Sequence, residues 1–266
     1  MKDQNIHNFN KVNTLMNNQP NVKKNVCIVI PCYNEEKGLI IEKYSRFIEE
    51  NQEILICFVN DGSTDNTLEI IEGLKKSYPN QVVVHNLAKN VGKAEAIRNG
   101  MHFCNENHQF DYIAYLDADL ATSLEECLSM TSYLNDNIRF VFGSRIKRIG
   151  AVIERNYFRF LVGRIIATSI SYILKLDVYD TQCGCKVFSK ELATVVFKDA
   201  FVSKWLFDVE IFDRIIKFYG RDKVLKKMME VPLVKWIDAG DSKVKTSYFF
   251  KLWVDLYQIN KIVKLK

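Results

Sequence analysis

The chain has 266 residues, of which 48% are hydrophobic and 26% are charged. This length allows one large α/β domain with a complete core, and the composition excludes extensive disorder outside the chain ends. The net charge of +5 is modest, and seven cysteines, several of them inside apolar runs, indicate reduced core thiols rather than a disulfide framework. We therefore expect a cytoplasmic protein.

The two ends of the chain differ from its middle. Residues 1–24 are rich in Asn, Gln and Lys and lack the apolar segment of a signal peptide, which predicts a flexible polar tail. No run of about 20 uninterrupted apolar residues occurs, so we expect no membrane-spanning segment. Residues 241–266 combine lysines with a broad helical stripe of large apolar side chains, which predicts an amphipathic C-terminal helix.

Strand-like and helix-like segments alternate through the first half of the chain. Short β-branched or apolar runs predict strands, and longer amphipathic segments between them predict helices. The expected strands are residues 26–30, 54–59, 81–85 and 110–116, and the expected helices are residues 35–51, 67–77 and 94–105. This rhythm predicts right-handed βαβ units, hence a mainly parallel, Rossmann-like central sheet flanked by helices.

Each of these strands is followed by a turn with polar side chains. Because the carboxyl ends of parallel strands meet at one edge of a sheet, these side chains are expected to line one crevice. They are Tyr33, Glu35, Asp61, Lys93, Asp117 and Asp119. For Asp65 we instead expect a cap on the helix that follows.

Asp117 and Asp119 lie one residue apart at the end of a buried strand. Hard cations such as Mg²⁺ or Mn²⁺ take one or two carboxylates from a protein and complete their shell with phosphate oxygens and water. The pair therefore suggests a divalent metal that bridges a nucleotide diphosphate, although Asp-x-Asp alone also occurs in solvated turns.

Several other functional classes lack their motifs in this chain. No Gly-x-Gly-x-x-Gly follows the first strand and no Walker lysine motif occurs, which disfavours dehydrogenases and P-loop enzymes. A nucleotidyltransferase would need a glycine-rich phosphate loop that is missing near the first strand. The acidic and aromatic strand-end turns argue against a nucleic-acid-binding protein.

Basic residues concentrate in the second half of the chain. Lys and Arg gather between Arg145 and Arg164, and again from residue 243 to the end, with large apolar residues among them. Either segment could lie on an anionic membrane surface or dock as an amphipathic helix on its own domain. The sequence leaves both interpretations open.

Taken together, the motifs resemble those of family 2 glycosyltransferases with the GT-A fold. The first three are residues 29–36 (VIPCYNEE), 59–65 (VNDGSTD) and 116–119 (LDAD). The downstream motifs look like those of polyprenyl-phosphate sugar transferases, especially the dolichyl-phosphate β-glucosyltransferase type. They are residues 89–93 (KNVGK), 118–122 (ADLAT), 143–145 (GSR), 180–188 (DTQCGCKVF) and 205–210 (WLFDVE). The likeness implies a GT-A domain over residues 25–240.

The resemblance also implies roles at the donor site. Pro31, Tyr33 and Glu35 would hold the base and ribose, and Asp61 would also read the nucleoside. Asp117 would contact the nucleotide, while Asp119 would coordinate the metal. The full nucleotide-sugar set is Pro31, Tyr33, Glu35, Val59, Asp61, Lys93, Asp117, Ala118 and Asp119.

On the acceptor side, the resemblance implies that a lipid phosphate is the nucleophile. A phosphomonoester has a second pKa of about 6, so it arrives anionic and scarcely needs a general base. Arg145 and Lys186 match motifs that would hold it, and Arg155 and Arg159 are further candidates. Asp208 or Glu210 would orient the donor sugar or the acceptor, and the sequence does not separate those roles. The expected catalytic set is Asp117, Asp119, Asp208 and Arg145.

The sequence therefore predicts an inverting, metal-dependent transferase that moves a hexose, most plausibly glucose from UDP-glucose, onto a polyprenyl phosphate. We expect it to associate peripherally with the cytoplasmic face of a membrane and not to bind nucleic acid. Two alternatives remain open. One is a family 2 enzyme acting on a sugar hydroxyl, with Asp208 or Glu210 as base. The other is a GDP-mannose-dependent polyprenyl-phosphate mannosyltransferase.

Overall fold

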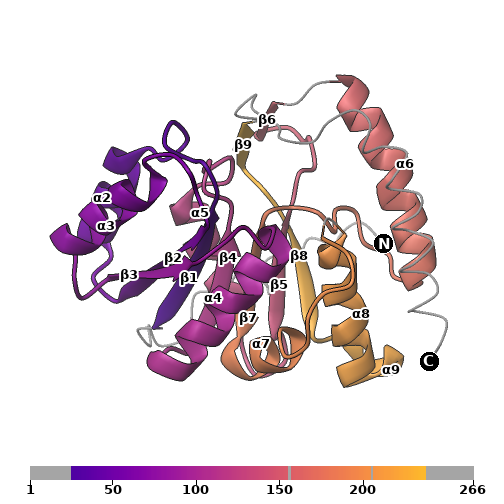
Figure 1. Ribbon diagram of the computed structural model, residues 1–266. Coiled ribbons are helices and arrows are strands. Elements are labelled where there is room, and N and C mark those ends of the chain that lie inside the picture. Colours follow the sequence, from indigo (N-terminus) through magenta and orange to yellow (C-terminus); the bar gives the residue numbers. More distant parts are fainter. Residues whose placement is uncertain (1–24, 155–156, 205, 238–266) are drawn as a thin grey trace.

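The computed structural model describes residues 25–154, 157–204 and 206–237 (Figure 1). The expected polar tail at residues 1–24 and the expected C-terminal helix at residues 241–266 lie outside these ranges. The described chain folds into a central sheet with helices on both faces, as the alternation of strands and helices predicts.

The central sheet has seven strands in the order β3-β2-β1-β4-β7-β5-β8. β1 is parallel to β2 and β4, β2 is parallel to β3, and β5 is parallel to β8; β7 alone runs antiparallel to its neighbours β4 and β5. The expectation of a mainly parallel sheet is therefore confirmed. The strands are β1 (Val26–Cys32), β2 (Ile54–Asp61), β3 (Val82–Leu87), β4 (Tyr112–Leu116), β5 (Phe140–Ser144), β7 (Cys185–Ser189) and β8 (Met228–Pro232).

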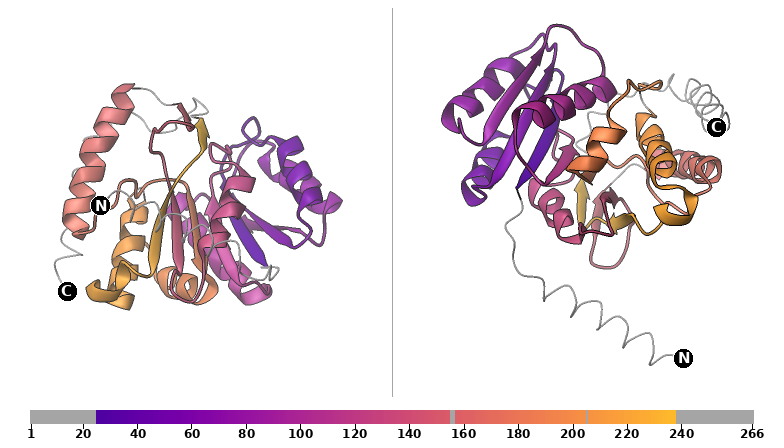
Figure 2. Two further views of the ribbon diagram at one scale, coloured as in Figure 1. Left: turned by 180° about the vertical axis from the view of Figure 1, so that it is seen from behind. Right: turned by 90° about the horizontal axis from the view of Figure 1, so that it is seen from below.

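The helices cover both faces of this sheet (Figures 1 and 2). α2, α3, α5 and the 3-10 helix η1 share one core with one set of strand side chains, whereas α4, α6, α7 and α8 share the other core. The helices are α2 (Ile41–Glu50), α3 (Thr67–Ser77), α4 (Lys93–Asn107), α5 (Leu124–Ser129), η1 (Met130–Tyr133), α6 (Tyr157–Leu174), α7 (Lys190–Val196), α8 (Phe207–Tyr219) and α9 (Arg221–Val224).

The side chains of β1 alternate between the two cores, as a pleated strand requires. Cys27 and Val29 pack on the face of α4, whereas Val26, Ile28 and Ile30 pack on the face of α2 and α3. Because both faces of the sheet are covered, the strand reads in the sequence as a continuous apolar run rather than an alternating one.

A second, two-stranded parallel sheet lies beyond the carboxyl ends of the central strands. It pairs β6 (Val152–Glu154) with β9 (Lys235–Ile237) and stands beside the start of α6 (Figure 1). No helix in the described ranges is long and apolar enough to cross a bilayer.

The helix expected at residues 35–51 begins later, at Ile41. The backbone N–H of Glu35 donates to Thr67 Oγ1 at 2.7 Å, which ties this segment to the turn that follows β2. The carbonyl of Glu35 then accepts from the N–H groups of both Gly38 and Leu39, which closes a separate turn. The expected helical start was therefore wrong, and the segment is a loop at the edge where the strands end.

Candidate active site

The strand order places a natural ligand site at the carboxyl ends of β1 and β4. The chain leaves β1 towards β2 and β3 on one side, while β4 lies on the other side, so the loops after β1 and β4 diverge at this point. Ligands in open α/β sheets bind at such a switch point. Asp117 and Asp119 follow β4 directly, as the sequence predicted.

The loop that carries the two aspartates is a tight turn. Leu120 N donates to the carbonyl of Asp117 at 3.2 Å, and Ala121 N donates to Asp119 Oδ1 at 3.0 Å. Leu120 adopts a left-handed backbone with φ of 51°, which costs a residue with a Cβ about 1–2 kcal/mol. The backbone at Leu120 is thus locally strained, and this strained turn places both carboxylates at one edge of the sheet.

Lys93, the first residue of α4, forms an ion pair with the first of these carboxylates. Its Nζ lies 2.6 Å from Asp117 Oδ1, and both side chains remain partly exposed. Partial burial opposes the charge on the amine, but the Asp117 carboxylate outweighs this and raises the pKa of Lys93. The sequence placed both residues at one site, and the structure brings them into contact.

The second carboxylate has a different environment. Burial raises the pKa of Asp119, and the negative charge of Asp117 raises it further. The two carboxylates therefore repel one another. A bound cation would relieve this repulsion.

Gly184 allows Asp117 to occupy its position. A Cβ at residue 184 would lie 2.1 Å from Asp117 Oδ2, far inside van der Waals contact. Asp117 N also donates to the carbonyl of Gly184 at 3.1 Å, so the two backbones are joined at this point. Gly184 precedes β7, which pairs with β4, and no local pattern in the sequence revealed that it borders the carboxylate.

Tyr44 supports the residue between the two aspartates. The phenol lies on α2, is fully buried, and donates to the carbonyl of Ala118 at 2.9 Å. Ala118 itself is 4% exposed, and its expected contact with the nucleotide sugar stays a prediction. No local pattern in the sequence reveals the role of Tyr44, because its partner lies 74 residues away.

The loops after β1 and β2 are locked to one another by side-chain hydrogen bonds. Asn34 N donates to Ser63 Oγ, and Glu36 N donates to Asp65 Oδ2, both at 3.1 Å. Asp65 Oδ1 also accepts from Thr67 N at the start of α3, which confirms the expected capping role. Tyr33 directly precedes these hydrogen-bonded residues, and 39% of its surface is exposed. Its ring is therefore accessible where the base of the nucleotide is expected.

Asp61 organises the loop that leads to Lys93. Its Oδ1 accepts from Val91 N at 2.7 Å and its Oδ2 accepts from Gly92 N at 3.0 Å, and the residue is 2% exposed. Burial raises its pKa against these two hydrogen bonds. The side chain of Lys204, from the loop before α8, lies next to Gly92 and adds a cation that the sequence analysis did not assign.

Val59 does not line the site with its side chain. It pairs with Pro31 across β1 and β2, and its side chain is fully buried in the core under α4. A nucleotide contact from Val59 would therefore have to come from its backbone, and the expected contact stays a prediction.

Arg145, directly after β5, is held by a bidentate ion pair with Asp180. Its Nε lies 2.6 Å from Asp180 Oδ2 and its Nη2 lies 2.9 Å from Oδ1. The guanidinium carbon lies 5.2 Å from the centre of the Trp236 ring. Glu230 on β8 in turn accepts from Asp180 N and Tyr179 N. This network fixes the direction of the guanidinium without removing it from solvent, since 25% of the side chain stays exposed.

Lys186 lies in the core rather than at the surface. It stands opposite Tyr115 in the antiparallel pairing of β7 with β4 and is fully buried. Its Nζ donates to Asp208 Oδ1 at 2.6 Å and to the carbonyl of Cys183 at 2.7 Å. The expected contact with an acceptor phosphate is therefore corrected, because the amine is enclosed and neutralises Asp208.

Asp208 is the centre of this buried group. Its Oδ1 also accepts from the hydroxyl of Tyr115, whose pKa is raised well above its usual value by burial and by the Asp208 charge. Glu210, two residues later on α8, faces elsewhere and accepts from Val202 N and Ser203 N. The structure thus separates the two acids: Asp208 is tied to β4 and β7, and Glu210 holds the loop before α8.

The expected metal can be tested against the side chains at the site. In the described ranges, no group of three or more His, Cys, Asp or Glu side chains could enclose a metal ion. Asp117 and Asp119 alone would supply carboxylate oxygens, and of these Asp117 Oδ1 lies against the Lys93 ammonium. Mg²⁺ or Mn²⁺ commonly takes few protein oxygens and completes its shell with phosphate and water, so the pair fits such an ion.

Two of the predicted phosphate ligands cannot be placed. Arg155 lies outside the described residues, and of Arg159 only the backbone, within α6, is described. Cys183 and Cys185 are both buried free thiols, and they take part in no metal cluster of the described chain.

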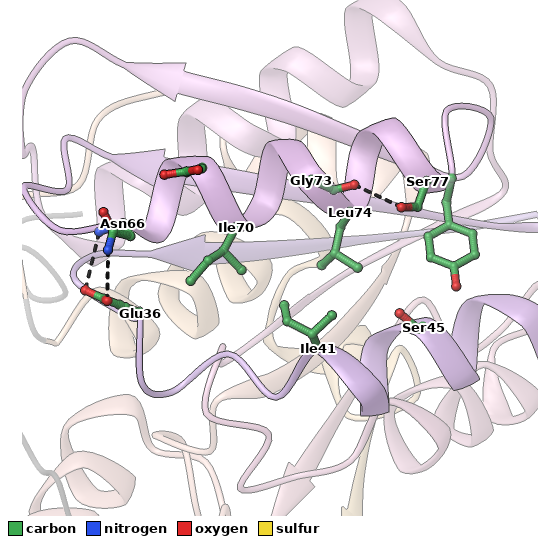
Figure 3. Close-up of a pocket in the computed structure, with 10 residues that line it drawn as sticks. Glu36, Ile41, Ser45, Asn66, Ile70, Gly73, Leu74 and Ser77 are labelled. Carbon is green, nitrogen blue, oxygen red and sulfur yellow. Dashed lines mark hydrogen bonds between the residues drawn. The ribbon is translucent and has the colours of Figure 1, made fainter.

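A groove between α2 and α3 lies apart from this site (Figure 3). Its volume is about 700 Å³, and Ile41, Ile70 and Leu74 line it beside Glu36 and Asn66. None of the aspartates or cations of the candidate site belongs to its lining. We therefore place the chemistry at the carboxyl edge of the sheet and not in this groove.

The family model for glycosyl transferase family 2 matches residues 27–197. This chain belongs to glycosyl transferase family 2. The matched range contains both aspartates of the turn after β4, Lys93 and the Arg145–Asp180 pair. The glycosyltransferase thus has the family expected from its motifs, and its central sheet and helices match the GT-A fold of its structural neighbours.

Among curated proteins, the glycosyltransferase is 34% identical over 248 residues to the dolichyl-phosphate beta-glucosyltransferase ALG5C of Trichomonas vaginalis, covering 87% of this chain and 69% of that protein. It is 31% identical over 204 residues to the human dolichyl-phosphate beta-glucosyltransferase, covering 71% and 62%. A solved glucosyl-3-phosphoglycerate synthase from Mycobacterium tuberculosis, in complex with Mn²⁺, UDP and glucosyl-3-phosphoglycerate, superposes with a TM-score of 0.63 at 16% identity, covering 91% of this chain and 80% of that one.

Proposed function

We propose that this glycosyltransferase moves glucose from UDP-glucose onto dolichyl phosphate or a related polyprenyl phosphate, with inversion at the anomeric carbon. The relatives that are about one third identical carry the name dolichyl-phosphate beta-glucosyltransferase. Solved neighbours of the same fold bind UDP or UDP-glucose together with Mn²⁺, which supports the choice of donor and of a divalent metal.

The contacts of the two candidate bases, Asp208 and Glu210, support a phosphate rather than a sugar hydroxyl as the acceptor. A sugar hydroxyl would need a carboxylate to take its proton. Asp208 is engaged by Lys186 and Tyr115, and Glu210 binds the backbone of the loop at Val202 and Ser203. An acceptor that arrives already anionic needs neither acid, and a phosphomonoester is such an acceptor.

The reaction then follows from the charges at the sheet edge. An oxygen of the lipid phosphate attacks the anomeric carbon from the side opposite the leaving diphosphate. The new carbon–oxygen bond forms as the bond to the diphosphate breaks, and the electron pair leaves with the nucleotide. An α-linked donor therefore gives a β-linked product.

Residues of the chain hold the two anionic reactants. Asp117 and Asp119 would bind the divalent cation, which offsets the charge that develops on the departing diphosphate. Lys93, whose side chain is partly exposed, keeps Asp117 in place and would add positive charge beside the cation. Arg145, fixed by Asp180, offers its remaining donors to the acceptor phosphate.

The deciding experiment uses the purified full-length protein with a panel of radiolabelled nucleotide sugars, dolichyl or undecaprenyl phosphate, and Mg²⁺ or Mn²⁺. We expect labelled glucose in the lipid phase from UDP-glucose, and none when dolichol without phosphate replaces the acceptor. Product from GDP-mannose alone would identify the mannosyltransferase alternative. Slow metal-dependent hydrolysis of one donor without lipid product would contradict a lipid phosphate acceptor and favour a sugar hydroxyl.

Two variants assign the donor and acceptor halves in the same assay. Asp119→Ala should abolish turnover in either metal while the protein stays folded. Arg145→Ala should raise the KM for lipid phosphate far more than the KM for the nucleotide sugar, and equal effects on both would contradict its placement.

The proposal includes the location of the enzyme. A polyprenyl phosphate is embedded in a bilayer, so we place the protein peripherally at the cytoplasmic face of a membrane. Fractionation of cells that express the full chain should recover it with membranes, and salt should release it.

A further inference from the structure

The small sheet of β6 and β9 connects the candidate site to an exposed surface. On its inner face, Trp236 lies against the Arg145 guanidinium. At its end, Ile237 N donates to the carbonyl of Ala121, two residues after Asp119. The same sheet therefore touches the proposed acceptor ligand and the metal-binding turn, and its outer face lies only a few residues from the chemistry.

The turn that leads into β6 exposes an isoleucine at its tip. Ala151 N donates to the carbonyl of Arg148 at 3.1 Å, which places Ile149 and Gly150 at the corners of the turn, and Gly150 has φ of 84°. Positive φ at the second corner is typical of a type II turn. Ile149 is consequently fully solvent-exposed, with 104% of its reference surface accessible.

Apolar and basic side chains continue from this tip across the sheet. Val152 is 49% exposed and Val234 is 56% exposed, and Val152 N donates to the carbonyl of Val234 at 2.8 Å, so their backbones are adjacent at the start of the small sheet. Lys235 pairs with Val152 across the sheet and is exposed. We call this surface the β6–β9 patch, defined as Lys147, Arg148, Ile149, Val152, Val234 and Lys235.

The patch is rigidly attached to the domain. Arg148 Nη2 donates to the carbonyl of Pro232 at 3.4 Å. Glu126 on α5 accepts from the backbone N–H groups of Val234 and Lys235. These hydrogen bonds fix the backbone that carries the exposed apolar side chains. A surface that contacts only water does not need such side chains.

We propose that the β6–β9 patch contacts an anionic lipid surface and seats the enzyme over its acceptor. This inference rests on the proposed function, because a lipid phosphate must reach Arg145 from the plane of a bilayer. Two exposed cations, Lys147 and Arg148, directly precede Ile149 in the sequence, and a third, Lys235, pairs with Val152. The acids nearby are Glu154 on β6 and the half-buried Glu126. An apolar tip next to cations suits the interface between acyl chains and anionic headgroups.

The test measures how the full-length protein sediments with vesicles of phosphatidylcholine mixed with phosphatidylserine, and with vesicles of phosphatidylcholine alone. The wild type should bind the mixed vesicles. The double variant Ile149→Ser/Val234→Ser should lower partitioning by about tenfold or more, because two apolar side chains no longer enter the interface. Lys147→Ser and Arg148→Ser should each lower it by about fivefold, and only in the presence of phosphatidylserine.

A matched control comes from the other end of β8. Leu225 is 66% exposed and precedes β8, whereas Val234 follows β8, so the two residues lie beyond opposite ends of this strand. Leu225→Ser should leave vesicle binding unchanged. Equal losses in Leu225→Ser and in Ile149→Ser/Val234→Ser would show a nonspecific effect of surface polarity and overturn the proposal.

The acceptor assay separates this inference from the proposed function. Ile149→Ser/Val234→Ser should lose transfer to long-chain lipid phosphate in vesicles but keep transfer to a short, water-soluble isoprenyl phosphate. Vesicle binding that depends on Ile149 without transfer to any lipid phosphate would support the patch and refute the function. Binding that the double variant retains, or that disappears only when residues 241–266 are removed, would overturn the patch.

Discussion

The Asp117 carboxylate lies against the α-carbon of Gly184, so close that a Cβ there would be 2.1 Å from Asp117 Oδ2. A glycine between Cys183 and Cys185 thus defines where the first acid of the proposed metal site can lie. The contact joins the turn after β4 to the chain just before β7, which pairs with β4 along its whole length.

We expect Gly184→Ala to displace the Asp117 carboxylate and to lower metal-dependent turnover by about a hundredfold, since small misplacements of a catalytic group have effects of this size. Steady-state kinetics with a titration of Mn²⁺ measures the change. Gly163→Ala is the control, because a Cβ at that position on α6 meets no atom within 4 Å. Unchanged kinetics in Gly184→Ala would show that Asp117 can move without cost.

The Lys186–Asp208 pair should behave as a buried ion pair. Removing one partner leaves a charge uncompensated in the core, so Lys186→Met should lower the free energy of unfolding by about 3–5 kcal/mol. Lys186→Met combined with Asp208→Asn should be less destabilised than the sum of the single variants. Denaturant unfolding of all four proteins measures this coupling.

Lys93→Met is the control for these Lys186 and Asp208 variants. The Lys93–Asp117 pair is partly exposed, and its loss should change the free energy of unfolding by about 1 kcal/mol or less. If Lys186→Met instead left stability unchanged and only raised the KM for lipid phosphate, the amine would be an acceptor ligand after all.

Tyr44→Phe should weaken both the fold and the active-site turn. The variant leaves the buried carbonyl of Ala118 without its donor, which should cost about 1–3 kcal/mol of unfolding free energy and reduce turnover. Tyr78→Phe removes a hydroxyl that donates to Glu49 at the surface, and it should change neither quantity appreciably. A Tyr44→Phe protein with normal kinetics would limit this residue to a packing role.

The Arg145–Asp180 pair should make stability depend on acid. The ion pair and hydrogen bonds from Arg145 outweigh burial and lower the pKa of Asp180 from 3.8 to about 2. A depressed pKa stabilises the fold above the unfolded value, and this stability is lost as the pH falls through the folded value. The difference corresponds to about 2 kcal/mol, at about 1.4 kcal/mol per pKa unit.

Asp180→Asn should therefore lower the unfolding free energy by about 2 kcal/mol at neutral pH, and its deficit should shrink as the pH falls from about 4 to about 2. Asp177→Asn, an exposed acid in the same loop, is the control. A deficit that stays constant across this pH range would mean that the carboxylate charge does not stabilise the fold.

Local patterns predicted the fold class and the sheet edge where the candidate site lies. The apolar run before Asp117 gave β4, the polar turns gave the edge where Lys93 and Asp117 meet, and Asp65 caps α3 as expected. These predictions succeeded because strand burial, caps and turns depend on residues that are close in the sequence. The expected helix start at residue 35 was wrong because the Glu35 carbonyl closes a separate turn with Gly38 and Leu39, and the Glu35 N–H ties this turn to Thr67, 32 residues away.

The sequence by itself determined the alternation of strands and helices, and with it the sheet edge that carries Asp117 and Asp119. Only the tertiary structure decided which cation pairs with which acid. Lys93 pairs with Asp117 and Arg145 with Asp180. Lys186 pairs with Asp208 inside the core. The pairing of β7 with β4 turns Lys186 inward next to Tyr115, and burying a charge is tolerable only beside a partner. That partner is 22 residues away, beyond the reach of any local pattern.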